Sequence, residues 1–79
     1  MKQTEYFKRR VLGDRPYIDL AWCEAIVREP EATEVQSDGR VRHWGFVPEL
    51  GKHLRVVTLD DYETLHNAFP DRSFKPRES

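Results

Sequence analysis

The chain has 79 residues, of which 38% are hydrophobic and 34% charged, and its formal net charge is -1. This length predicts one domain with a small core. The lack of a basic excess argues against a strong, non-specific polyanion surface, but leaves room for a small basic site. The single cysteine, Cys23, excludes an intramolecular disulfide and a thiolate cluster, and is best interpreted as a small buried side chain. With neither a signal segment nor a membrane-spanning stretch, the expected location is cytoplasmic.

Two helices are predicted in the N-terminal part of the chain. Thr4 can cap a short helix that ends at Gly13, because a threonine hydroxyl accepts from free backbone N–H groups. Asp19 can cap a second helix, which runs to about Arg28 before Pro30. Apolar side chains recur at helical spacing along this second helix, which predicts a broad buried face.

Three runs rich in β-branched and aromatic residues follow, separated by turn formers. They predict antiparallel strands at 40–47, 53–59 and 63–69, and residues 32–36 could form a short edge strand before them. Asp38-Gly39 predicts a tight hairpin with a positive φ angle. The predicted fold class is therefore α+β, with two N-terminal helices packed on a three- to four-stranded antiparallel sheet. The whole chain, 1–79, is expected to be one domain, in which 70–79 form a partly ordered tail.

Alternation along each strand predicts which side chains face the helices. The expected inward set is apolar: Trp44, Phe46, Leu54, Val56, Leu65 and Phe69. The opposite face is expected to gather His43, Arg55 and His66 from neighbouring strands. A register shift of one residue would disperse this cluster. If Trp44 points outward instead, its ring could stack a nucleobase.

The order of these elements resembles the RelE/ParE toxin superfamily, in particular its small BrnT-like members. The resemblance runs from Thr4 to Pro70. Its features are the charged first helix, the second helix closed by Arg28-Glu-Pro30, the hairpin 36–42, and the strands 54–57 and 65–69. It implies a type II toxin that cleaves mRNA without a metal or other cofactor. It also implies RNA, the ribosome and a cognate antitoxin as partners.

Within that resemblance, the implied catalytic residues are His66 and Arg55, and the expected sheet face adds His43 as a third candidate. The implied RNA-binding residues are Arg40, Arg42, Arg72 and Lys75. The chemistry suits these residue types, because histidine exchanges protons near neutral pH and arginine binds phosphate through two parallel hydrogen bonds. The basic run 8–10 is most simply a solvated helix face, with phosphate contact as its alternative.

Simpler interpretations remain open for each of these residues. Histidines on the open face of a small sheet are commonly only solvated, and His53, beside a turn, is expected to be one of these. His43 and His66 have no obvious third partner for a metal site. The alternative function is a non-catalytic binding module, which forms a homodimer or pairs its sheet edge with a partner chain.

Overall fold

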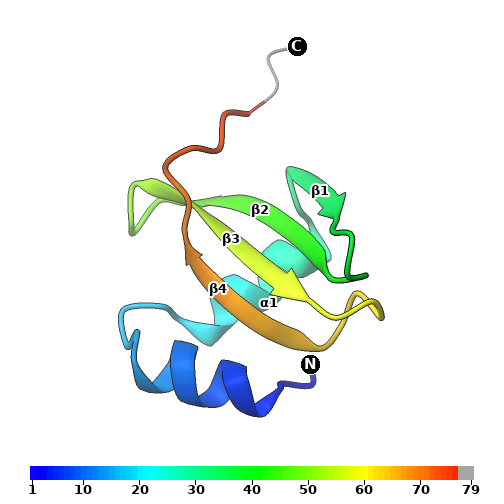
Figure 1. Ribbon diagram of the computed structural model, residues 1–79. Coiled ribbons are helices and arrows are strands. Elements are labelled where there is room, and N and C mark those ends of the chain that lie inside the picture. Colours follow the sequence, from blue (N-terminus) through cyan, green and yellow to red (C-terminus); the bar gives the residue numbers. More distant parts are fainter. Residues whose placement is uncertain (77–79) are drawn as a thin grey trace.

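The computed structural model describes residues 1–76, so the last part of the predicted tail, 77–79, lies outside the described residues. The fold is α+β, with two helices and a four-stranded antiparallel sheet in the order β1-β2-β3-β4. Figure 1 shows α1 behind the middle of the sheet and the first helix, η1, alongside β4. The elements in chain order are η1 (Phe7–Gly13), α1 (Leu20–Arg28), β1 (Ala32–Val35), β2 (Val41–Val47), β3 (Lys52–Thr58) and β4 (Leu65–Pro70).

Both predicted helix caps are confirmed. The Thr4 hydroxyl accepts a hydrogen bond from the backbone N–H of Phe7 at 3.1 Å, and the Asp19 carboxylate accepts one from that of Ala21 at 2.9 Å. The first helix is a π-helix, which has wider turns than an α-helix. No helix among residues 1–76 is long and apolar enough to cross a membrane.

The hairpin between β1 and β2 forms as predicted, but its loop is longer than a two-residue primed turn. Gln36 and Arg40 are paired by a backbone hydrogen bond of 2.7 Å, which leaves three residues in the loop. Of these three, only Gly39 has a positive φ angle, at 90°. A type I turn followed by a left-handed glycine has this geometry, whereas a type I′ turn needs two positive φ angles.

The sheet buries one face against the helices, and half of the predicted inward set lies there. Leu54, Val56 and Leu65 are fully buried in the core, together with Phe7 and Ile26 from the helices. The complete core cluster also contains Val11, Ile18, Cys23, Val27, Val47 and Ala68, with Leu12, Leu20, Trp22 and Leu50 packed against it.

The prediction that Trp44, Phe46 and Phe69 face the helices is wrong. In the observed register Trp44 pairs with Arg55, and Arg55 pairs with Phe69, so these three side chains share the outer face. Two features cause the error. The side of β2 that meets α1 carries Gly45, where Ile26 fills the space of a side chain. In β4 the pairing shifts beside Leu65, so the extra residue reverses the alternation before Phe69.

Candidate functional site

Arg55 occupies the centre of the outer face of the sheet. Its guanidinium carbon lies 5.6 Å from the ring centroid of Trp44 and 4.9 Å from that of Phe69, within the range of cation–π contact. The three residues come from adjacent strands, β2, β3 and β4. The charge is therefore held between two aromatic rings, in a fixed position above the sheet.

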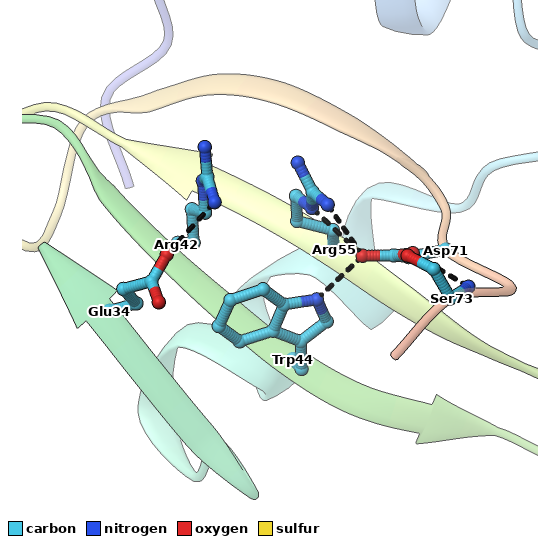
Figure 2. A network of polar contacts seen from close by, with 6 residues as sticks. All are labelled: Glu34, Arg42, Trp44, Arg55, Asp71 and Ser73. Atoms are coloured by element: carbon cyan, nitrogen blue, oxygen red, sulfur yellow. Dashed lines mark hydrogen bonds and ion pairs between the residues drawn. The ribbon is translucent and has the colours of Figure 1, made fainter. Parts of the chain in front are cut away.

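Asp71, just after β4, holds Arg55 in this position (Figure 2). Its Oδ2 accepts hydrogen bonds from Nε of Arg55 at 3.0 Å, from Nη2 of Arg55 at 2.7 Å and from Nε1 of Trp44 at 2.9 Å. Its Oδ1 accepts from the backbone N–H and the hydroxyl of Ser73. Burial alone raises the pKa of the Asp71 carboxyl, but the hydrogen bonds from Ser73, Trp44 and Arg55, with the charge of Arg55, hold it well below its usual range.

Beside Arg55, the outer face is hollowed into a groove of about 540 Å³, which we call the cationic groove. Three arginines and one histidine line it, and no aspartate or glutamate does among the described residues. Its lining residues are Tyr6, Gln36, Arg40, Arg42, Arg55, Val57, His66, Asn67 and Phe69.

The carboxylates that pair with these arginines stand outside the lining of the groove. Arg42 Nη1 lies 2.8 Å from Glu34 of the edge strand, and Arg40 Nη1 lies 3.7 Å from Asp38 of the hairpin loop. Figure 2 shows the guanidinium groups of Arg42 and Arg55 projecting on the same side of the sheet. Pairing fixes the arginines while their remaining N–H groups can meet an anion in the groove.

His66 is the one titratable imidazole of the groove, and its environment favours the neutral form. Its Nδ1 lies 3.0 Å from the hydroxyl oxygen of Thr4, and its ring stacks on Tyr6 with centroids 5.0 Å apart. Burial and the positive charge of Arg40 lower the pKa of His66, while Asp38 acts in the opposite direction. A histidine with a lowered pKa is unprotonated at pH 7 and can accept a proton.

Of the seven predicted site residues, the groove brings together four: Arg40, Arg42, Arg55 and His66. Arg72 is exposed and does not line it. Lys75 lines a different hollow of the same face, over Trp44 and beside β1. Trp44 points outward there, but the ring of Phe74 stacks on it, with centroids 5.0 Å apart. This leaves Trp44 only 7% exposed.

The prediction that His43 joins Arg55 and His66 is wrong. His43 is 1% exposed on the helix-facing side of the sheet, where its Nε2 lies 2.9 Å from the hydroxyl oxygen of Thr58. The cause is the register of β2, in which His43 pairs with Val56 while Trp44 pairs with Arg55. His43 is therefore a core residue, and it does not contribute to the groove.

Sequence reasoning missed several residues that build or support the groove, among them Tyr6, Asn67 and Arg15. Tyr6 and Asn67 line it, and Arg15 fixes Asn67 from the loop between the helices. Arg15 Nη1 donates to the side-chain oxygen of Asn67 at 3.0 Å and to the backbone oxygen of Ala68 at 2.9 Å. Of these three residues, only Asn67 could have been suspected from the sequence, because it lies next to His66. Tyr6 and Arg15 are distant from β4 along the chain and reach it only in the folded protein.

Cys23 is buried in the core as predicted, and burial raises the pKa of its thiol to about 12, with Asp19 and Glu24 adding to the effect. A thiol with so high a pKa is a poor nucleophile. The expectation that His53 is only solvated is wrong, because its side chain is 16% exposed and packs against Phe46 and Phe74. His53 lies 3.1 Å from Glu31, outside the cationic groove. Within residues 1–76, no three His, Cys, Asp or Glu side chains gather closely enough to hold a metal ion.

In comparisons with known proteins, no family model, no curated protein and no solved structure matches this chain.

Proposed function

We propose that the outer face of the sheet binds RNA and cleaves it, as a RelE/ParE-like endoribonuclease would. The observation that carries the proposal is the cationic groove, in which Arg40, Arg42, Arg55 and His66 surround a space free of carboxylates among its described lining residues. Guanidinium groups bind phosphate oxygens and stabilise the charge of a phosphorane transition state. The element order, with two helices before four antiparallel strands, also agrees with the resemblance.

In this mechanism His66 acts as the general base. It removes the proton from a 2′-hydroxyl, whose oxygen forms a bond to the adjacent phosphorus while the bond from phosphorus to the 5′-oxygen breaks. The products are a 2′,3′-cyclic phosphate and a 5′-hydroxyl, whose proton comes from water. The required tautomer carries its proton on Nδ1, where Thr4 accepts it, and leaves Nε2 unprotonated.

Arg55 and Arg42 stabilise the phosphorane. Asp71 accepts hydrogen bonds from two nitrogens of Arg55, and Glu34 accepts one from Arg42. Both arginine side chains are therefore already ordered before the substrate binds. Preorganised charges of this kind stabilise a transition state without reorganising during the reaction. No group in this scheme depends on a metal ion, so cleavage is expected to continue in the presence of a chelator.

An RNA cleavage assay, with and without ribosomes, tests the proposal. His66→Ala and Arg55→Ala should each lose at least 100-fold in rate, as general-base and electrostatic contributions of about 10² to 10³ imply. His53→Ala serves as the matched control, because this histidine lies outside the groove. Equal cleavage by wild type and both groove variants, with folding intact by circular dichroism, would exclude the mechanism.

A second candidate function is a non-catalytic module that binds a partner chain along its sheet edge. The observation in its favour is β1, a four-residue strand at the edge of the sheet whose Val35 is 61% exposed. An antitoxin segment or a second copy could add a strand there. Wild-type protein that cleaves no RNA, has no effect on growth and is dimeric by light scattering would favour this function over catalysis.

A further inference from the structure

The cationic groove does not end at the sheet, because Tyr6 also lines a second hollow of about 310 Å³ on the first helix. The other residues of this hollow are Arg9, Arg10 and Asp14. Tyr6 precedes η1 directly and is 42% exposed. One face of its ring stacks on His66, so the two hollows adjoin at an aromatic ring that a ligand can reach.

The positive charge of the second hollow rests mainly on Arg9. Arg10 Nη1 lies 3.5 Å from Asp14, so its charge is partly compensated. Among residues 1–76, Arg9 has no carboxylate within ion-pair distance, and its side chain is exposed. From the sheet toward the first helix, the surface therefore presents the arginines of the sheet, then His66, then the ring of Tyr6 and then Arg9.

We propose that this surface is one continuous binding track for single-stranded RNA, with a base stacked on Tyr6 and a further phosphate bound by Arg9. The inference rests on the proposed function and extends it to a substrate of several nucleotides. An alternation of cationic and aromatic side chains matches the alternation of phosphates and bases along a single strand. In a duplex the bases are already stacked on each other and cannot reach a protein ring.

The two halves of the track can be tested separately with RNA of two lengths. A non-cleavable 2′-O-methyl dinucleotide fits within the cationic groove, whose lining includes Tyr6, whereas a hexanucleotide also reaches Arg9. Tyr6→Ala should lower the affinity for the hexanucleotide about tenfold, as loss of one stacked base implies. Arg9→Gln should lower the affinity for the hexanucleotide and leave that for the dinucleotide unchanged, because Arg9 does not line the cationic groove. Tyr6→Phe keeps the ring and should bind like wild type.

Arg9→Gln should reduce the salt dependence of hexanucleotide binding. The slope of log K against log salt should fall by about 0.7, the value for one phosphate contact on a single strand. Tyr17→Ala and Arg28→Gln are matched controls, since both residues are exposed and line neither hollow. Both controls should keep the affinity and the slope of wild type.

The outcomes separate this inference from the proposed function. If Tyr6→Ala and Arg9→Gln behave like the controls while Arg55→Ala loses affinity for both RNAs, the proposed track is wrong. RNA binding in the cationic groove is then still supported. If Arg9→Gln lowers the affinity for both RNAs equally, Arg9 does not bind a phosphate that only the longer strand supplies, which also overturns the track. If wild-type protein binds neither RNA at low salt, both proposals are overturned.

Discussion

Thr4 and His66 are joined side chain to side chain, with 3.0 Å between Oγ1 and Nδ1, although 62 residues separate them along the chain. The same hydroxyl caps the first helix by accepting from Phe7. The backbone reinforces the contact, since Leu65 donates to the carbonyl of Lys2 at 2.8 Å and accepts from the N–H of Thr4 at 2.9 Å. The orientation of the imidazole in the cationic groove therefore depends on the start of the chain.

Thr4→Val should reduce both stability and RNA cleavage. Valine has the shape of threonine without its hydroxyl, so the helix cap is lost at a cost of about 1 kcal/mol. His66 also loses the partner that holds its Nδ1 proton, so the pH profile of cleavage should change as well as its rate. Urea melts and pH–rate profiles measure the two effects. Thr4→Ser keeps the hydroxyl and should resemble wild type; a valine variant as active as the serine variant would contradict the positioning role of Thr4.

Asp71→Asn should destabilise the protein by about 2 kcal/mol at pH 7, because the hydrogen bonds from Arg55 lose their charged acceptor. The pKa of Asp71 is lowered in the fold, so its contribution to stability is complete above the unfolded pKa of about 4 and is lost as the pH falls further. The difference between wild type and variant should therefore narrow below about pH 4.

Urea melts between pH 3 and pH 7 measure this difference. Asp60→Asn is the matched control, because Asp60 is an exposed carboxylate in a turn. A stability difference between wild type and Asp71→Asn that stays constant over the whole range would show that the charge of Asp71 is not what stabilises the network.

Much of the fold could be predicted from the sequence because its signals are local. Thr4 and Asp19 are strong caps, and Gly39 supplies the positive φ angle that its loop needs. The alternation of side chains within β3 was also predictable, so Leu54 and Val56 were placed correctly. Register between strands was not predictable, because it depends on contacts such as that of Ile26 with Gly45, which no local pattern encodes.

The candidate site, like the fold, was predictable only where local signals place its residues. Arg55 could be placed on the outer face from its own strand alone. His43 could not, since its position depends on how β2 pairs with β3. The approach of Tyr6 and Arg15 to β4 is a tertiary contact across more than 50 residues, and a single sequence contains no signal for it.

Gly45→Ala should destabilise the protein by about 1–3 kcal/mol, the usual cost of overpacking a core. A Cβ atom at this position would lie 2.7 Å from Cγ1 of Ile26, so the helix α1 must move or Ile26 must change rotamer. Ile26→Ala creates the space for the added methyl group. The double variant should therefore be less destabilised than the sum of the two single variants, as measured by urea denaturation. Additive costs would show that Gly45 is not in contact with Ile26.

The stability of the protein should fall as the pH drops below 6.5, because the core holds His43 in its neutral form. Burial lowers the pKa of His43 from 6.5, so the unfolded chain binds a proton that the folded chain does not. Stability therefore rises with pH through this range and is complete above about pH 6.5, the unfolded value. The pKa of His66 is lowered as well, mainly by burial, so this residue adds to the same pH dependence.

Urea melts at several pH values between 5 and 8 separate the two histidines. His43→Gln can still donate a hydrogen bond to Thr58 but does not titrate, so it should lose part of the wild-type pH dependence. His66→Gln should lose another part, and the double variant should lose most of it. Because the double variant lacks both groups, its stability should be nearly flat over this range. A His43→Gln variant with the full pH dependence of wild type would show that protonation of this buried imidazole does not lower the free energy of unfolding.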